Sequence, residues 1–303
     1  MSAASLIPPL VGLAAAPLFV GLIAKLKARA VGRQGPPLVQ PYRDLLRSLR
    51  KGAVYSRDTT WVFRAGPLLS ALSAAAALFL IPAAGLAAPV AFAGDFLLLA
   101  YLLALGRVFT VLAALDTGSS FEGMGASREL LVSTLAEPAL FLVLLTLVTR
   151  TGELSLSAIL APGGAAGGLH AAAPLALAIG ALVLLLLAEN SRVPVDDPTT
   201  HLELTMIHEV MVLDHGGPDL ALIDYGAALK LWAFAALTVG IALAPGEWSP
   251  AAGAALFLAG MIAVAALVAV IESSMARLRL TRLPQFLVVA AVLAGFSLLL
   301  SIF

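Results

Sequence analysis

The feature that most constrains the fold is a series of eight long apolar segments separated by polar stretches. A helix needs about 20 mostly apolar residues to cross the hydrocarbon core of a bilayer. Hydrophobic residues make up 61% of the chain and charged residues only 12%, whereas a soluble domain carries about 25% charged residues. The sequence therefore predicts an all-α integral membrane protein, with a bundle of about eight transmembrane helices and cytoplasmic amphipathic helices in a single domain over residues 1–303. The predicted spans are residues 4–24, 66–88, 93–115, 130–149, 173–189, 220–244, 251–272 and 283–302.

Lysine and arginine are distributed unevenly between these spans. Ten of the eighteen lie in residues 25–65, whereas the alternate connections contain only Arg150. Connections rich in Lys and Arg remain on the cytoplasmic side of the membrane, so both termini are predicted to face outward. The first span has no basic region before it, which favours a retained helix over a signal peptide. The loops predicted to face the cytoplasm are residues 25–65, 116–129, 190–219 and 273–282.

The first of these loops contains an amphipathic pattern. From Tyr42 to Lys51 the sequence reads YRDLLRSLRK, with leucines at helical spacing between basic residues. This pattern predicts a basic helix at the bilayer surface. Two roles are compatible with it: a topology signal that touches anionic lipid, or a docking platform for a soluble partner. A turn is predicted just before it at Arg33–Pro37, because two prolines after a glycine cannot continue a helix.

The second predicted loop, residues 116–129, is rich in glycine and serine. Irregular backbone of this kind is tolerated at membrane depth only where protein or water covers it. Glu122, Glu129 and Glu137 follow at spacings of seven and eight, which would place them on one face of a continuous helix. Gly123 and Gly125 argue against such continuity before residue 126. Glu137 lies at the edge of an apolar run and is therefore the stronger functional candidate.

A polar island at residues 189–230 interrupts the apolar sequence, and it holds eight of the eighteen acidic residues and three of the four histidines. Ionisable groups beside or inside a membrane are costly and indicate function. Arg192 lies three residues after Glu189, close enough to compensate its charge. Asp197 followed by Pro198 is typical of a helix start, and a helix is predicted from Pro198 to about residue 213.

Three histidines lie on one stripe of this predicted helix. Their seven-residue spacing separates consecutive rings by about 10 Å along the axis, which is too far for one metal ion. No metal site is therefore predicted. The stripe could instead contact a partner protein or a buried water chain, or it could be a solvated face.

Other ionisable residues fall inside predicted spans. Asp95 and Arg107 are too far apart to pair within the third span, so each requires a partner on another element or a position near an interface. Asp224 and Lys230 could pair, although a separation of six residues is not ideal on one helix. Glu272, just before the basic run at residues 277–282, suits an interfacial ion pair.

Several classes of active site are absent from the sequence. The chain contains no P-loop, dinucleotide fingerprint, nucleophile elbow or HExxH motif. It also contains no cysteine, so it cannot bind an iron–sulfur cluster through thiolates. A set of carboxylates entering the bundle from the cytoplasmic side indicates a proton path or a coupling element.

Four segments together resemble a known family. They are Arg33-Gln34-Gly35-Pro36 with the following Gln40-Pro41 and Asp44, then Asp116–Glu137, then Ala188–Leu204 with its A-E-x-x-R-x-P-x-D pattern, and Arg279–Leu283. The chain resembles the membrane subunit shared by respiratory complex I, where it is NADH dehydrogenase subunit 1, and by energy-converting membrane-bound nickel–iron hydrogenases. The run DDPTTHLELTMIHE at residues 196–209 is similar to the formate hydrogenlyase and hydrogenase-4 type of subunit.

The resemblance implies a multi-pass subunit of the cytoplasmic (inner) membrane that anchors a soluble redox arm. The implied partners are the nickel–iron hydrogenase large subunit and the iron–sulfur small subunit on the cytoplasmic face, antiporter-like membrane subunits and lipid, with no nucleic acid. No cofactor is expected in this chain, because the nickel–iron centre and iron–sulfur clusters would lie in the partners. The implied docking residues are Arg33, Gln40, Arg43, Asp44 and Arg47.

The same resemblance implies a path that couples electron transfer to proton or sodium movement. The residues implied first are Glu137, Glu189, Arg192, Asp196 and Glu203. A second group comprises Glu129, His201, His208, Glu209 and Asp214.

Two other functions remain compatible with the sequence. One is a complex I subunit that shapes a quinone chamber, although the departure from the complex I pattern after Pro198 argues against it. The other is an independent secondary ion transporter, although paired broken helices typical of such proteins are not evident.

Overall fold

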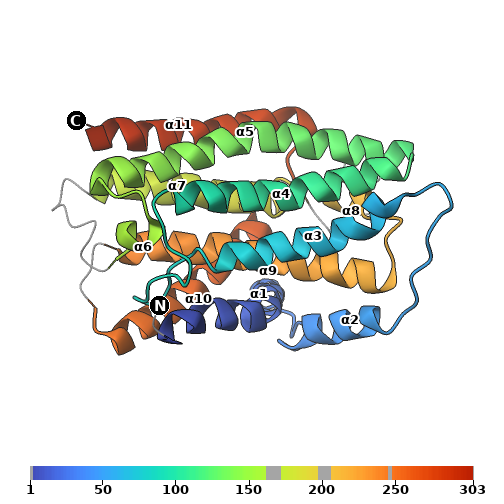
Figure 1. Ribbon diagram of the computed structural model, residues 1–303, viewed down its shortest axis with the longest axis horizontal. Coiled ribbons are helices and arrows are strands. Elements are labelled where there is room, and N and C mark those ends of the chain that lie inside the picture. Colours follow the sequence, from blue (N-terminus) through green and yellow to red (C-terminus); the bar gives the residue numbers. More distant parts are fainter. Residues whose placement is uncertain (1–2, 162–171, 197–205, 245–247, 303) are drawn as a thin grey trace.

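The computed structural model describes residues 3–161, 172–196, 206–244 and 248–302, and within these ranges the chain is helical, without strands. Among these described residues, eight helices are long and apolar enough to cross a membrane. The predicted fold class, an all-α integral membrane protein with about eight spans, is therefore confirmed. The spanning helices, which run across Figure 1, are α1 (Ile7–Ala30), α3 (Trp61–Leu78), α4 (Asp95–Asp116), α5 (Ser120–Thr151), α7 (Ala172–Glu189), α9 (Gly217–Leu243), α10 (Pro250–Ser274) and α11 (Leu283–Ile302).

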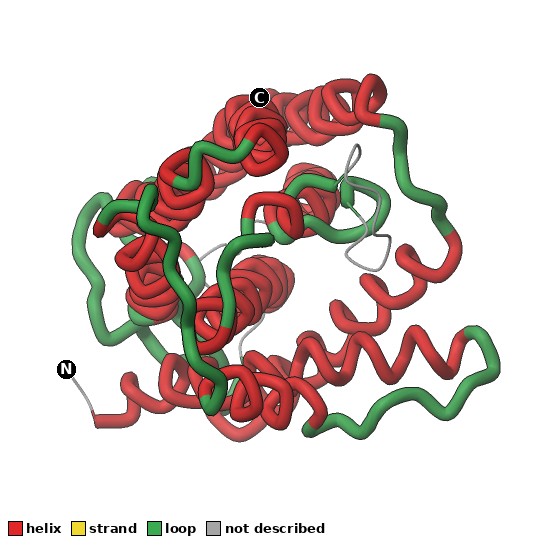
Figure 2. The backbone as a smooth tube through the Cα atoms, turned by 90° about the vertical axis from the view of Figure 1, so that its right-hand side faces the viewer, coloured by secondary structure: helices red, strands yellow, loops and turns green. Residues whose placement is uncertain are grey.

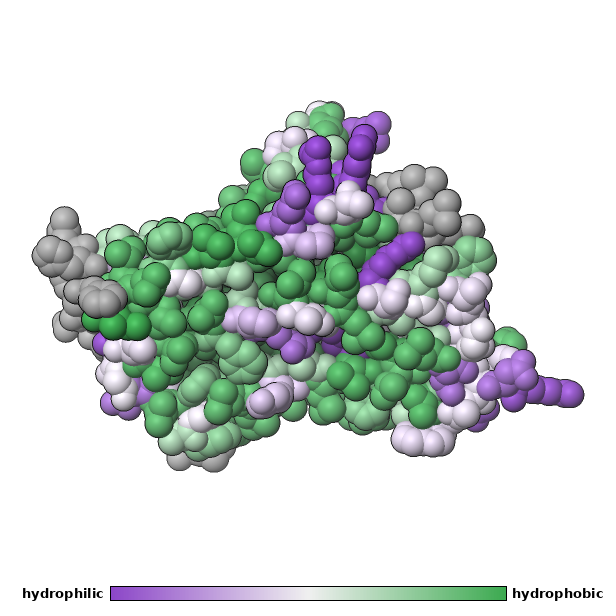
Figure 3. Space-filling view, turned by 90° about the horizontal axis from the view of Figure 1, so that it is seen from above, coloured by the Kyte–Doolittle hydropathy of each residue, from purple (hydrophilic) through white to green (hydrophobic). Residues whose placement is uncertain are grey.

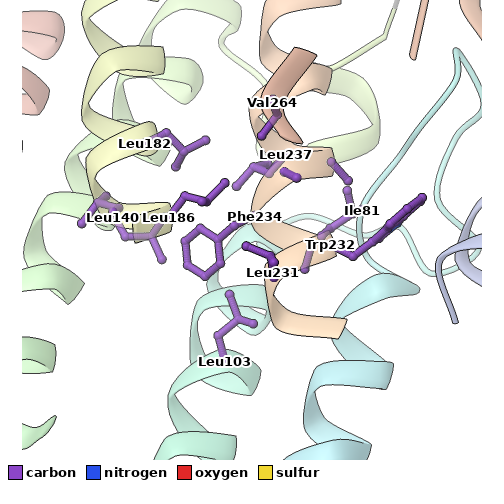
Figure 4. Packing of buried hydrophobic residues seen from close by; sticks show 14 of the residues in the cluster. Ile81, Leu103, Leu140, Leu182, Leu186, Leu231, Trp232, Phe234, Leu237 and Val264 are labelled. Atoms are coloured by element: carbon purple, nitrogen blue, oxygen red, sulfur yellow. The ribbon is translucent and has the colours of Figure 1, made fainter. Parts of the chain in front are cut away.

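Helix α9 lies in the middle of the bundle. In its membrane-spanning stretch 72% of the residues are buried, against 28% for α10 and 22% for the stretch that contains α11. Figure 4 shows side chains from α4, α5, α7 and α10 gathered around Phe234 and Leu237 of α9. Because lipid is as apolar as these side chains, helices in a membrane associate mainly through close packing and polar contacts. Because α9 is buried along most of its length, the polar groups that it carries lie inside the bundle.

The outer helices expose apolar side chains. On α10 and α11 the exposed residues include Leu258, Ile262, Val288 and Val292. Seen from the side of α5 and α11, the surface in Figure 3 is mostly hydrophobic. Its strongly hydrophilic side chains gather near the upper middle of the view and at the right, the end that carries α2 and α8 in Figure 1. This distribution suits a surface surrounded by lipid along most of its length.

Short elements connect the spans at the two ends of the bundle. Helix α2 (Gln40–Leu49) and the single turn α8 (His208–Met211) lie at one end, whereas α6 (Leu156–Ile159) and both termini lie toward the other (Figure 1). Figure 2 views the bundle along its axis, so most helices are seen close to end-on. An even number of crossings places both termini on one side, as the sequence predicted; which side faces the cytoplasm stays a prediction.

The predicted amphipathic helix is present as α2. It spans residues 40–49 rather than 42–51, and no residue of it is buried. It packs against α1 and α9, and the Tyr42 hydroxyl donates a hydrogen bond to the carbonyl of Ala14. The helix therefore lies against the middle of α1 and against α9, and its exposed arginines remain available for contact.

Helix α3 differs from the predicted span at residues 66–88. It begins at Trp61 and ends at Leu78. Asp116, the last residue of α4, accepts hydrogen bonds from the Thr60 amide at 2.6 Å and the Phe63 amide at 3.2 Å. This carboxylate satisfies amides that have no partner within the helix, so α3 starts earlier than hydropathy alone indicates. After residue 78 the chain turns through Ala84 and Gly85, both with positive φ.

Helix α5 corrects the prediction of a loop at residues 116–129. It begins at Ser120 and continues for 32 residues, through Gly123, Gly125 and Pro138. A Cβ atom on Gly125 would lie 2.3 Å from Val210 Cγ1, whereas one on Gly123 would meet nothing within 4 Å. The absence of a side chain at Gly125 therefore allows α8 to pack directly on α5. Glu122, Glu129 and Glu137 do lie on one continuous helix.

The polar island also differs from its prediction. The predicted N-cap Asp197 and the start of the predicted helix lie outside the described residues. In the described part of that predicted helix, residues 206–213, only residues 208–211 are helical. Asp196 accepts hydrogen bonds from the amides of Ile207 at 3.0 Å and His208 at 3.2 Å, which supports a new, separate turn. Val195, Ile207 and Val210 are buried, so this irregular backbone is covered by protein, as membrane depth requires.

Candidate coupling site

A buried guanidinium lies at the centre of the candidate site. Arg107 of α4 is 8% exposed. Its Nη1 donates to Glu137 Oε1 at 2.8 Å, its Nη2 donates to Glu189 Oε2, and its Nε lies 3.3 Å from Glu129 Oε1. A guanidinium presents five N–H donors in a fixed fork and stays charged. One arginine thus joins carboxylates from α5 and α7.

A second cation reaches the same group from α9. Lys230 Nζ lies 2.8 Å from Glu189 Oε2, and the Glu189 side chain is only 4% exposed. Lys230 therefore pairs with Glu189 and not, as the sequence suggested, with Asp224. The cluster of Arg107, Glu129, Glu137, Glu189 and Lys230, called here the Arg107 cluster, has a net charge of −1 when all five groups are ionised.

The Arg107 cluster lies well inside the membrane-spanning part of the bundle. Arg107, Glu137 and Lys230 are 12, 14 and 13 residues from the ends of α4, α5 and α9 on the α6 side. At 1.5 Å per residue these positions are roughly 18–21 Å along the helices, within a hydrocarbon core of about 30 Å. Charges at such a depth are stable only when paired, as these are.

Small residues allow the helices around the cluster to approach closely. A Cβ atom on Gly106, next to Arg107, would lie 2.4 Å from Ser73 Oγ of α3. One on Gly226 of α9 would lie 3.1 Å from Ala71 Cα. Small residues at such crossings are typical of membrane helices. The close crossings leave the hydroxyls of Ser70, Ser73 and Thr110 beside the cluster.

These hydroxyls line a cavity of about 80 Å³ together with Arg107, Glu129, Glu189 and Lys230. A polar cavity needs only about 10–15 Å³ of such volume for each water molecule. The cavity is therefore large enough for several. Water or hydroxyl groups between ionisable side chains can pass protons from one to the next.

A larger cavity of about 350 Å³ adjoins the first. It lies between α1, α2 and α9 and is lined by Arg192, Asp196, His208, Glu209 and Asp224, among others. The two cavities share Asn190, Ser191, His208 and Ala227 in their walls. Polar groups thus extend from the α2 end of the bundle to the Arg107 cluster.

Two further ion-pair groups lie at that end. Glu272 pairs with Lys27 and with Arg192, each at 3.3 Å. Asp196 Oδ1 lies 2.8 Å from Arg277 Nη2. Arg192 therefore compensates Glu272 and not, as predicted, Glu189. The predicted interfacial pair of Glu272 does form, but with α1 and the polar island instead of the basic run after α10.

The described coupling residues that the sequence predicted lie in three places: the Arg107 cluster, the larger cavity and the exposed surface. Glu129, Glu137 and Glu189 belong to the Arg107 cluster, and Asp196, Arg192, His208 and Glu209 line the larger cavity. Asp214 is exposed, and its amide donates to Glu122 Oε1 at 3.2 Å. His201 and Glu203 lie outside the described residues.

Two residues of the cluster were not among the predicted site residues. Arg107 and Lys230 were identified only as ionisable groups inside spans, and their partners are 22 to 82 positions away in the sequence. Asp95, the other group in the third span, is completely buried and accepts hydrogen bonds from Ser155 Oγ at 2.8 Å and the Leu156 amide at 2.7 Å. Both residues of the third span thus find partners on other elements, as the sequence required.

The histidines take separate positions. His208 lines both cavities, whereas His215 is buried with its ring stacked on Phe63 at 3.9 Å between centroids. Burial lowers the pKa of His215, and the neighbouring Asp219 and Asp214 oppose this shift. Burial and a hydrogen bond with Asp219 raise the pKa of the nearby Tyr55. No group of three or more metal-ligating side chains occurs among the described residues.

The predicted docking residues lie on and before α2. Arg43, Asp44 and Arg47 are exposed on α2, and Arg33 is exposed before it. Gln40 Nε2 donates to Asp44 Oδ1 at 2.9 Å. Asp44 also lines the larger cavity. The exposed arginines leave a basic surface at this end of the bundle.

Comparison with known proteins shows sequence and fold similarity over most of the chain. The chain is 33% identical over 289 residues to "Formate hydrogenlyase subunit 4" of Escherichia coli (strain K12), covering 92% of each protein. It is 34% identical over 227 residues to "Hydrogenase-4 component C" of the same organism, covering 75% of this chain and 70% of that protein. A chain in the solved structure of the membrane-bound sulfane sulfur reductase, an archaeal respiratory membrane complex, has the same fold, with a TM-score of 0.82, 22% identity and 98% coverage of both chains.

The protein family described as "NADH dehydrogenase" matches residues 3–303. The match extends over nearly the whole chain and includes every residue of the Arg107 cluster and both cavities. The chain therefore belongs to the NADH dehydrogenase subunit 1 family.

Proposed function

We propose that this chain is the membrane-anchor and coupling subunit of an energy-converting, membrane-bound nickel–iron hydrogenase complex of the formate hydrogenlyase type. In this role it docks the soluble redox arm and links electron transfer to proton or sodium movement. The observation that carries the proposal is the Arg107 cluster, in which one arginine and one lysine bind three carboxylates from two other helices inside the membrane. The similarity to formate hydrogenlyase subunit 4 supports the choice of complex.

The cluster is suited to coupling because two cations hold three carboxylates, which leaves one negative charge uncompensated when all five groups are ionised. Glu189 is shared between Arg107 and Lys230. A proton or cation that arrives from the larger cavity would change this sharing, since every partner is held within a few ångströms. The change would alter the ion pairs of all four helices that carry the cluster, α4, α5, α7 and α9. Redox chemistry at the α2 end and ion movement deeper in the bundle could be linked in this way.

The larger cavity favours the hydrogenase-type function over a quinone chamber. Asp44, Asp196, Glu209 and Asp224 supply four carboxyl groups to its walls, and burying an apolar ring against them would remove their solvation. Quinone-linked activity of the purified complex, or its inhibition by quinone analogues, would favour the alternative.

The coupling role is tested by Glu189→Gln in the intact complex. We expect electron transfer and assembly to persist, but proton or sodium uptake by inverted membrane vesicles to fall about tenfold to a hundredfold, because hydrogen bonds to charged groups contribute about 1.5–3 kcal/mol. The matched control is Glu153→Gln, the same chemical change at an exposed site outside the cluster. Unchanged ion uptake in an assembled Glu189→Gln complex would refute the coupling role.

The assignment to a complex is tested by its composition. Extraction in a mild detergent, followed by mass spectrometry, is expected to recover a nickel–iron large subunit and an iron–sulfur small subunit with this chain. Recovery of the chain alone, active in ion transport without partners, would instead favour an independent transporter.

A further inference from the structure

A buried proline interrupts the hydrogen bonding of α1 near the middle of the membrane. Pro17 lies ten residues after the start of this helix at Ile7, roughly 15 Å along it at 1.5 Å per residue. Proline has no amide hydrogen, so the carbonyl four residues earlier, that of Leu13, receives no donor from the helix. A carbonyl without a partner is costly in hydrocarbon. A donor from another element is therefore required at this turn.

Two tyrosine hydroxyls reach the interrupted turn from other elements. Tyr225 of α9 donates a hydrogen bond to the Leu13 carbonyl at 2.9 Å. Tyr42 of α2 donates to the carbonyl of the next residue, Ala14. Both α2 and α9 pack against α1, so the turn before Pro17 is bonded to each of its two neighbours.

The same turn forms part of the wall of the larger cavity. Pro17 lines this cavity from α1, Pro41 lines it from α2, and Asp224 lines it from α9. Pro41 and Asp224 directly precede Tyr42 and Tyr225 in the sequence. The two hydroxyl bonds therefore fix the spacing of the three elements that enclose the cavity.

Close packing on both sides of Pro17 ties α1 to these neighbours. A Cβ atom on Gly21, four residues after the proline, would lie 2.3 Å from the carbonyl oxygen of Leu38 in the segment before α2. One on Gly12 would lie 2.9 Å from Trp232 Nε1 of α9. Because helices kink preferentially at proline, a displacement of α2 would bend α1 at this turn.

We propose that Tyr42, Pro17 and Tyr225, called here the Pro17 hinge, link α2 to the walls of the larger cavity, and that the two tyrosines are positioning residues for ion coupling. The inference deepens the proposed function and rests on it for a soluble partner and for ion movement. A partner bound to the exposed arginines of α2 displaces Tyr42, and the hinge carries this displacement to α9. Five residues after Tyr225, α9 holds Lys230 of the Arg107 cluster.

The number of ions moved per molecule of hydrogen formed tests the hinge in the intact complex. Tyr42→Phe and Tyr225→Phe each remove one hydroxyl and keep the ring. We expect each change to lower this ratio in inverted membrane vesicles by about twofold to tenfold, the population shift that one lost hydrogen bond produces. A purely structural defect would reduce hydrogen formation and ion uptake together and would leave the ratio unchanged.

The matched control is Tyr55→Phe. This change also removes a bonded hydroxyl, since Tyr55 forms a hydrogen bond with Asp219, but Tyr55 lines neither cavity. The ratio is expected to stay the same in this variant. An unchanged ratio in both hinge variants, or an equal fall in Tyr55→Phe, would overturn the proposal.

Thermal unfolding of the detergent-purified complex tests the contact itself. Tyr225→Phe leaves the Leu13 carbonyl without a donor, so we expect it to lower the melting temperature by about 3–5 °C. In a Pro17→Ala background the helix supplies that donor, and the same change should lower the melting temperature by less than about 2 °C. Tyr55→Phe should have the same effect in both backgrounds, because distant sites are additive. Equal effects of Tyr225→Phe in the two backgrounds would contradict the hinge.

The outcome can be separated from that of the proposed function. If Glu189→Gln leaves ion uptake intact while the effect of Tyr225→Phe depends on Pro17, the coupling role fails and the contact stands. If Glu189→Gln lowers ion uptake but both hinge variants keep the ratio, the coupling role stands and the hinge fails.

Discussion

At the scale of single residues, Arg107 organises the site because its fork of donors reaches three carboxylates at once. From the sequence it could be identified as a buried charge that needed a partner, but the partner could not be named. Glu129, Glu137 and Glu189 lie on two other helices, and only the packing of those helices brings them to Arg107. Hydropathy and spacing along the chain contain no direct information on that packing.

Replacing Arg107 with leucine is expected to destabilise the subunit by about 3–5 kcal/mol, because it leaves buried carboxylates with Lys230 as their only remaining cation of the cluster. Arg107→Lys should be milder, since it keeps the charge but loses the fork. Thermal unfolding in detergent measures both. The control is Arg279→Leu, at an exposed arginine, which should change stability by less than about 0.5 kcal/mol. Similar stability of Arg107→Leu and Arg279→Leu would contradict a central role for Arg107.

At the scale of helices, the sequence predicted the number of spans and most of their positions. It failed at α3 and α5 for physical reasons. Helix α3 starts early because Asp116 satisfies its first amides, a contact between residues more than 50 positions apart. Residues 120–129 were predicted as a loop because glycine is unfavourable in helices, yet Gly125 is where α8 packs against α5. A composition rule cannot distinguish a glycine that breaks a helix from one that admits a neighbour.

The two glycines of α5 provide a matched test of this packing. Gly125→Ala would place a Cβ atom 2.3 Å from Val210 Cγ1 and 3.0 Å from the Ile207 carbonyl oxygen, so we expect a loss of about 1–3 kcal/mol from overpacking. Gly123→Ala meets nothing within 4 Å and should be neutral or stabilising by up to about 1 kcal/mol. Thermal unfolding of both variants decides the matter, and equal effects would show that α8 does not rest on Gly125.

At the scale of the whole molecule, polar groups are continuous from the α2 end of the bundle to a face in the middle of the membrane. The larger cavity, the cavity beside Arg107 and a small cavity of about 20 Å³ lined by Glu137 follow one another through shared residues. The sequence indicated a carboxylate-rich entrance in the polar island. Asp196, His208 and Glu209 line the larger cavity, and the role of this cavity as an entrance stays a prediction. The continuation through α4 and α9 to Glu137 depended on tertiary structure.

The predicted orientation can be tested because the chain contains no cysteine. Val54 is 87% exposed near the α2 end, and Leu154 is 50% exposed near the α6 end. We expect a membrane-impermeant thiol reagent to label Leu154→Cys in intact spheroplasts, and Val54→Cys only in inverted vesicles, because the basic residues lie mainly at the α2 end. The opposite labelling pattern would reverse the assigned orientation.

Helix α7 ends at Glu189, inside the bundle instead of at its surface. Aligned peptide dipoles give the C-terminus of a helix an effective charge of about −0.5, and this helix directs that end toward the Arg107 cluster. The backbone itself thus adds to the negative potential that Arg107 and Lys230 offset. We therefore expect the cavity beside Arg107 to attract small cations and to repel anions, even before any side chain changes its protonation. A short span that ends inside the bundle therefore places a fixed negative potential within the membrane.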